Sequence, residues 1–180
     1  MAGLRNLLIA AVAALSAATG AAQQTDSFQS FPASPSPEAL RNLPNPRRSV
    51  DALGGRCEHL EFGGLDETTH CRALLTKSHY DRGQSIQFWL NGPTGEPAGA
   101  LSFFGFGEKL SGETTTLAVE LVTIVDGTPP AGRKAQGVGT CEFGKFAAVP
   151  VRVTCTAKVD GRTYGGTFLT DGTPPERQRD

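Results

Sequence analysis

The chain has 180 residues, of which 17 are lysine or arginine and 18 are aspartate or glutamate, so its formal net charge at pH 7 is −1. A nearly neutral domain lacks the basic excess that nucleic-acid binding requires. We therefore expect no nucleic-acid partner.

The first 22 residues have the pattern of a secretory signal peptide. Arg5 supplies a positive start, the stretch 7–18 is almost entirely apolar, and small residues follow it. A run this short does not cross a bilayer but suits the core of a cleavable signal. Cleavage would remove one basic residue and no acidic residue, giving a net charge of −2. We expect a periplasmic or secreted protein with no membrane span after cleavage.

Residues 23–50 are predicted to form a linker, because prolines interrupt every possible element. Proline removes a backbone donor and biases the preceding residue away from helix. The segment either tethers the following domain or lies across its surface. The prolines stand at positions 32, 35, 37, 44 and 46.

Beyond this linker, apolar residues recur at every second position, which is the period of a half-buried strand. The clearest stretch is 151–159, and the following Asp160-Gly161 is typical of a two-residue hairpin turn into a strand at 163–170. The β-domain is expected at 51–173, with a polar tail at 174–180. Further strands are expected near 55–62, 70–77, 84–90, 98–107, 115–125 and 137–146.

Short strands separated by turn residues predict an all-β fold, either an antiparallel β-sandwich or a small barrel of about eight strands. Fourteen positions separate Cys57 from Cys71, and the same number separate Cys141 from Cys155. The repeated spacing favours these two local disulfides, whereas a four-thiolate zinc site would need closer cysteine pairs. It also suggests an internal duplication of a disulfide-tied strand unit, although two similar hairpins in one topology would give the same pattern.

All three histidines lie between positions 59 and 79, among several carboxylates. Imidazole and carboxylate groups are ligands for zinc and similar metals, so His59 and His79 are the candidate metal residues. Strict alternation would place His59 on the same strand face as Cys57. The acidic loop 58–67 is a weaker calcium candidate, because it lacks the spacing of a dedicated calcium loop. The alternative is that these are ordinary polar residues on a disulfide-closed loop.

Aromatic residues give the strongest indication of a binding surface. Phe103 and Phe104 are neighbours on one expected strand, so they must point to opposite faces. On the expected strand 84–90, Trp89 points to the face opposite to that of Ile86 and Phe88. An exposed aromatic face on a secreted domain is typical of a ligand or partner surface. The alternative is that these rings belong to the core or are covered by an edge loop. We select Tyr80, Trp89 and Phe104 as candidate binding residues.

The sequence contains no recognisable catalytic constellation: no nucleophile elbow is present, and the cysteines are expected to be oxidised. The leading hypothesis is a non-catalytic binding domain of the cell envelope or exterior, with a protein or a glycan as partner and with no cofactor. The alternatives are a metal-dependent or hydrolytic enzyme that uses the region from His59 to His79, and a purely structural spacer.

Overall fold

The computed structural model describes residues 45–126, 132–146 and 149–179, and the structural statements below concern these residues. The signal peptide expected at 1–22 and most of the linker expected at 23–50 lie outside them. The described part is all-β apart from one short 3-10 turn, η1. Its elements are β1 (Arg47–Phe62), β2 (Leu65–Asp66), η1 (Thr68–His70), β3 (Cys71–Tyr80), β4 (Gln84–Asn91), β5 (Pro97–Gly105), β6 (Glu108–Ser111), β7 (Thr114–Asp126), β8 (Gly132–Phe143), β9 (Arg152–Val159), β10 (Arg162–Thr170) and β11 (Glu176–Arg179).

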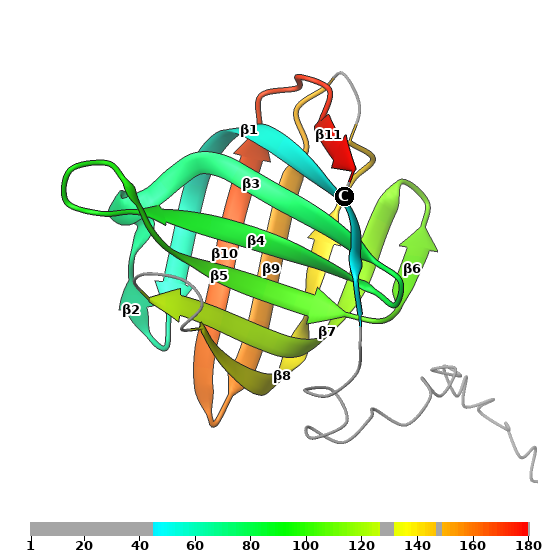
Figure 1. Ribbon diagram of the computed structural model, residues 1–180. Coiled ribbons are helices and arrows are strands. Elements are labelled where there is room, and N and C mark those ends of the chain that lie inside the picture. Colours follow the sequence, from blue (N-terminus) through cyan, green and yellow to red (C-terminus); the bar gives the residue numbers. More distant parts are fainter. Residues whose placement is uncertain (1–44, 127–131, 147–148, 180) are drawn as a thin grey trace, which may run out of the picture. The chain divides into compact units, whose positions relative to one another are not determined.

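Eight of these strands form a closed antiparallel barrel in which each strand pairs with its neighbours along the chain. The order is β1-β3-β4-β5-β7-β8-β9-β10, and β10 closes the circle by pairing with β1. Figure 1 shows β3, β4, β5 and β7 in front and β8, β9 and β10 behind them. The structure therefore selects the barrel from the two architectures that the sequence left open. The long strands predicted from sequence are confirmed, whereas β2, β6 and β11 were not foreseen.

Closure depends on β1, which pairs with two partners in succession. Its first part pairs with β3 as far as Gly54, and its second part pairs with β10 from Gly55 onward. Gly55 lies at the change of partner, where an added Cβ would come 2.2 Å from the carbonyl oxygen of Leu169. Any side chain there would clash with the β10 backbone, so glycine lets the two strands meet.

The barrel interior is filled by apolar side chains from alternate positions of every strand. The largest fully buried side chains include Phe88, Phe103 and Phe168, each with no exposed surface. The rings of Phe88 and Phe103 meet edge to face, with their centroids 5.9 Å apart. An eight-stranded barrel has an interior just wide enough for side chains to fill or for one small ligand to enter. Here side chains occupy the middle of the barrel.

Both predicted disulfides are present, and each joins two neighbouring barrel strands. Cys141 and Cys155 form a directly opposed pair within the ladder of β8 and β9, and both are buried. Cys57 and Cys71 lie three positions beyond the last ladder pair of β1 and β3, where β1 leaves β3 for β10. The second bridge therefore holds the two strands together where their hydrogen bonds end. The internal duplication stays a prediction.

The β-structure extends past both ends of the domain expected from sequence. β1 begins at Arg47, inside the expected linker, and β11 lies inside the expected polar tail. Residues Ser49–Ala52 of β1 pair with Glu176–Arg179 of β11. The tail is polar, as expected, but part of it forms β11, and this strand could not be foreseen because it is exposed throughout and shows no alternation of buried and exposed residues.

One buried carboxylate anchors β11 to the barrel. Asp51 has 4% of its side chain exposed, and its two oxygens accept hydrogen bonds from Nε and Nη2 of Arg177 at 2.5 and 2.7 Å. The imidazole Nε2 of His79, on β3, lies 3.2 Å from the same carboxylate. The hydrogen bonds from Arg177 hold the pKa of Asp51 below its usual value, with smaller contributions from His79.

We expect Asp51→Asn to lower the free energy of unfolding at pH 7 by about 1–3 kcal/mol, because a hydrogen-bonded charge pair is lost at a buried position. The pKa of Asp51 is lowered from 3.8, so its stabilising effect is present above pH 4 and is lost as the pH falls through the folded-state value. The stability difference between wild type and variant should therefore shrink below about pH 4. Urea unfolding from pH 7 to pH 2.5 measures it, with Glu142→Gln as an exposed control. A difference that stays constant with pH would contradict the assignment.

Candidate functional site

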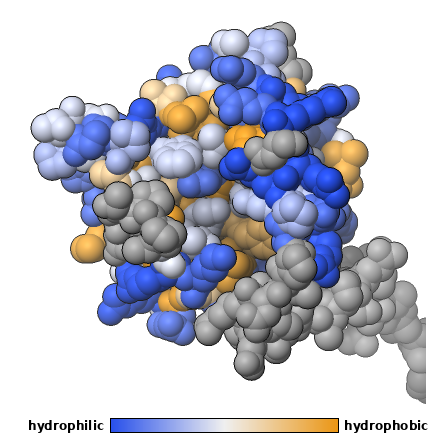
Figure 2. Space-filling view, viewed as in Figure 1, coloured by the Kyte–Doolittle hydropathy of each residue, from blue (hydrophilic) through white to orange (hydrophobic). Residues whose placement is uncertain are grey.

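A groove crosses the outer face of the front strands of the barrel. It encloses about 370 Å³ and is lined mainly by outward side chains of β4, β5 and β7. We call it the outer groove, and Figure 2 looks onto this face, where apolar and weakly polar residues lie between hydrophilic ones. Its lining residues are Asn45, Tyr80, Arg82, Ser85, Gln87, Ser102, Phe104, Phe106, Leu121, Thr123, Val125 and Lys134.

The ladder registers explain why hydroxyl and amide groups gather here. Gln87 on β4 pairs with Ser102 on β5, which pairs in turn with Thr123 on β7 and so with Lys134 on β8. Directly opposed residues on neighbouring antiparallel strands point to the same face. One row of polar side chains therefore runs across four strands on the outside of the barrel.

Three aromatic rings form the apolar side of the outer groove. The ring of Phe104 meets that of Tyr80 with centroids 5.5 Å apart, and meets that of Phe106 with centroids 5.0 Å apart, both edge to face. Phe103, the neighbour of Phe104, is fully buried inside the barrel. The expectation that these two phenylalanines point to opposite faces is confirmed.

The turn between β3 and β4 fixes the position of Tyr80. Asn45 makes two hydrogen bonds with the backbone of Arg82, donating to its carbonyl at 2.8 Å and accepting from its amide at 2.9 Å. Gly83 has φ +85°, and a Cβ there would lie 2.3 Å from the carbonyl oxygen of Gly105. The residues before β1 thus hold this turn, and the adjacent ring, at one end of the outer groove.

The structure brings together two of the three aromatic residues chosen from sequence. Tyr80 and Phe104 are in contact in the outer groove. Trp89 also belongs to the outer face of β4, but it lies beyond Gln87 and does not line the groove. Its indole nitrogen donates a hydrogen bond to the Thr76 hydroxyl at 3.1 Å.

The two histidines proposed as metal ligands have different neighbours. His79 contacts Asp51 near the start of β1, where its ladder partner is Ser49. His59 lies ten residues further along β1 than Ser49, and its imidazole is 3.7 Å from the carboxylate of Glu61. Within the described ranges, no three histidine, cysteine or acidic side chains are grouped as a metal site would require.

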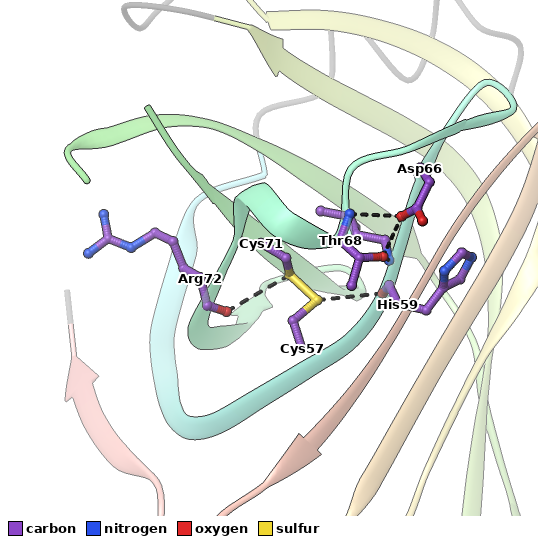
Figure 3. The surroundings of a disulfide bond; sticks show 7 residues. Cys57, His59, Asp66, Thr68, Cys71 and Arg72 are labelled. Atoms are coloured by element: carbon purple, nitrogen blue, oxygen red, sulfur yellow. Dashed lines mark hydrogen bonds between the residues drawn. A yellow bond between two sulfur atoms is a disulfide. The ribbon is translucent and has the colours of Figure 1, made fainter. Parts of the chain in front are cut away.

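His59 also does not share a strand face with Cys57. A bulge at this point of β1 lets Cys57 pair with Phe168 and His59 pair with Thr167, so the two residues point to opposite sides. Figure 3 shows the imidazole of His59 directed away from the disulfide. In the loop 58–67, the carboxylate of Asp66 accepts hydrogen bonds from the amide and hydroxyl of Thr68, and these bonds lower its pKa.

Sequence reasoning missed most of the polar residues of the outer groove. Alternation placed Gln87 on the same face as Trp89, which was a usable signal. It could not place Ser102 and Lys134 in one row with Gln87, because that depends on which strands pair and in which register.

Comparison with protein-family models, with curated proteins and with solved structures found no match for this chain. In the part of the chain that the structure describes, no helix has the length and apolar character needed to cross a membrane. Its two disulfides are typical of proteins from oxidising compartments outside the cytoplasm.

Proposed function

We propose that the protein is a non-catalytic binding domain, exported to the periplasm or beyond after removal of residues 1–22, and that its outer groove binds a glycan. The observation that carries the proposal is the side-by-side arrangement of aromatic rings and a row of hydroxyl and amide groups in one groove. Binding sites typically combine aromatic walls with a few polar groups that fix the orientation of the ligand.

The chemistry of the outer groove favours a carbohydrate over an apolar ligand. Sugar rings present C–H faces that pack against aromatic side chains and hydroxyl groups that exchange hydrogen bonds with serine, threonine and glutamine. The phenol of Tyr80 combines an apolar ring with a polar tip. Among the described residues that line the groove there is no carboxylate, and Arg82 and Lys134 are its charged members.

The test begins with thermal shift of the purified protein against maltohexaose, cellohexaose, chitohexaose and solubilised peptidoglycan fragments. A ligand that binds only the folded state raises the melting temperature once its concentration exceeds its dissociation constant. We expect at least one of these glycans to raise it. No shift with any of them would contradict a glycan ligand and favour a protein partner.

For the glycan that binds, Phe104→Ala and Gln87→Ala are each expected to weaken affinity by about tenfold, the effect of losing roughly 1.4 kcal/mol of contact. Isothermal titration calorimetry measures the change. Thr154→Ala is the matched control, because Thr154 is exposed on β9, outside the groove. Unchanged affinity in both groove variants would place the ligand elsewhere on the protein.

A further inference from the structure

The described part of the chain begins at the outer groove. Asn45, its first residue, belongs to the groove lining, and its side chain is fixed by the two hydrogen bonds with the backbone of Arg82. The carbonyl of Pro46 accepts a further hydrogen bond from the amide of Asp81 at 3.2 Å. The residues that precede Asn45 are therefore attached to the described structure at the end of the groove where Tyr80 lies.

The sequence shortly before Asn45 has the composition of peptides that bind aromatic grooves. Residues 31–37 are Phe-Pro-Ala-Ser-Pro-Ser-Pro, in which Pro32 and Pro35 have the spacing P-x-x-P. Proline-rich sequences favour the polyproline II conformation, which has about three residues per turn and no internal hydrogen bonds. Such sequences bind aromatic-lined grooves, because they lose little conformational entropy on binding.

The outer groove offers the groups that a proline-rich segment needs. The rings of Phe104 and Phe106 provide an apolar wall, and Tyr80 adds a ring with a hydroxyl group. Proline has no backbone N–H, so the segment is rich in carbonyl acceptors and poor in donors. Gln87 and Ser102 supply side-chain donors in the groove. No carboxylate that would repel these carbonyl oxygens occurs among the described lining residues.

Residues 31–37 also have the length that the groove requires. Pro37 precedes Asn45 by eight positions, which allows the chain between them to span up to about 26 Å. The groove lining runs from Tyr80 on β3 to Lys134 on β8, across four strand-to-strand steps of about 4.8 Å, or about 19 Å. In polyproline II, the stretch 31–37 extends about 22 Å, so it can reach the groove and cover it.

Attachment beside the groove makes even a weak contact sufficient for occupancy. A short tether gives a binding segment an effective concentration in the millimolar range. If the free peptide bound with a dissociation constant of about 1 mM, the tethered segment would occupy the groove for about half of the time. The tether starts at Asn45, which is fixed at the groove itself.

We propose that residues 31–37 bind in the outer groove of their own chain, with Phe31, Pro32 and Pro35 against its aromatic rings, and that they compete there with the glycan. The contact does not depend on which external ligand the groove binds. The competition rests on the proposed glycan function and gives the site a built-in regulator.

Nuclear magnetic resonance of the full chain tests the contact. The triple variant with Phe31→Ala, Pro32→Ala and Pro35→Ala should shift the side-chain amide resonances of Gln87, because it empties the groove. The resonances of Thr154, which is exposed on β9 outside the groove, should stay unchanged. Unshifted Gln87 resonances in the triple variant would overturn the proposal.

A double variant in the same segment is the matched control. With about three residues per turn, Ala33 and Ser36 lie on the edge of the helix that carries neither the pair Pro32 and Pro35 nor Phe31. Ala33→Ser combined with Ser36→Ala should therefore leave the Gln87 resonances at their wild-type positions. A shift as large as that of the triple variant would overturn the assigned contacts.

A synthetic peptide of residues 29–39 provides a second measurement. Added at millimolar concentration to the triple variant, it should return the Gln87 resonances toward their wild-type positions. No response to the peptide would overturn the proposal. Wild-type resonances that move to the positions of the triple variant on dilution would show that a second copy supplies the segment, and would overturn binding within one chain.

Calorimetry with a glycan that binds the groove tests the competition. The triple variant should bind this glycan at least twofold more tightly than the wild type, because a half-occupied groove halves the apparent affinity. Equal affinities would overturn the competition. If no glycan binds but the triple variant still shifts the Gln87 resonances, the glycan function is contradicted and the contact of residues 31–37 is supported.

Discussion

Replacing both Cys141 and Cys155 with alanine is expected to lower the free energy of unfolding by about 4 kcal/mol. The bridge closes a loop of about 15 residues, and the lost constraint on the unfolded chain is worth about 3 kcal/mol. Both cysteines are buried, with 0% and 1% of their surface exposed. The missing sulfur atoms therefore leave a small cavity that adds about 1 kcal/mol.

The other disulfide is the matched control, because Cys57 and Cys71 have the same separation of 14. They are only partly buried, so the corresponding double alanine variant should lose about 3 kcal/mol, mostly through chain entropy. Equilibrium unfolding in urea gives both values by linear extrapolation. A loss below about 1 kcal/mol for the Cys141–Cys155 pair would show that the barrel holds β8 and β9 together without it.

The second large effect is expected where β4 and β10 meet across the barrel interior. Phe88 is fully buried, and Phe88→Ala should cost about 3–5 kcal/mol through the cavity it leaves. Its ring packs on Gly166, where an added Cβ would lie 2.7–2.9 Å from three ring atoms. Gly166→Ala should therefore cost about 1–3 kcal/mol through overpacking, because Phe103 restricts movement of the ring.

A double-mutant cycle separates this contact from general damage to the core. Phe88→Leu removes the ring atoms closest to Gly166, so combining it with Gly166→Ala should cost less than the sum of the two single substitutions. The expected coupling is about 0.5–3 kcal/mol, the range for residues in contact. Gly139→Ala is the comparison: its Cβ would lie 1.9 Å from the Thr156 carbonyl oxygen, a backbone atom, so Phe88→Leu should not relieve it. Additive effects for Phe88 and Gly166 would contradict direct packing between them.

Local patterns in the sequence predicted much of the fold. The alternation in the stretch 151–159 predicted a strand with one buried face, and β9 has that pattern. Asp160 and Gly161 both have positive φ, as the predicted turn requires, and they join β9 to β10. The cysteine spacing predicted both disulfides. These signals are readable because a strand face, a tight turn and a short loop each depend on a few neighbouring residues.

The candidate sites depended far more on tertiary structure. The sequence grouped His59 with His79, but a bulge in β1 and the change of partner from β3 to β10 give them separate surroundings. No local pattern indicated that barrel closure brings Arg133 and Arg162 to the lining of one hollow. Bulges and strand partners are set by packing across the whole barrel, so no local pattern reveals them.

The sequence by itself determined the eight barrel strands, the turn between the last two of them, the cysteine pairing and the division of Phe103 and Phe104 between two faces. Each follows from the period of two along a strand or from residues close together in the chain. Only the tertiary structure decided that the sheet closes, that β11 joins β1 through Asp51, and that the lining of the outer groove comes together. Those features join residues far apart in sequence, and the register that joins them is set by the fit of the complete core.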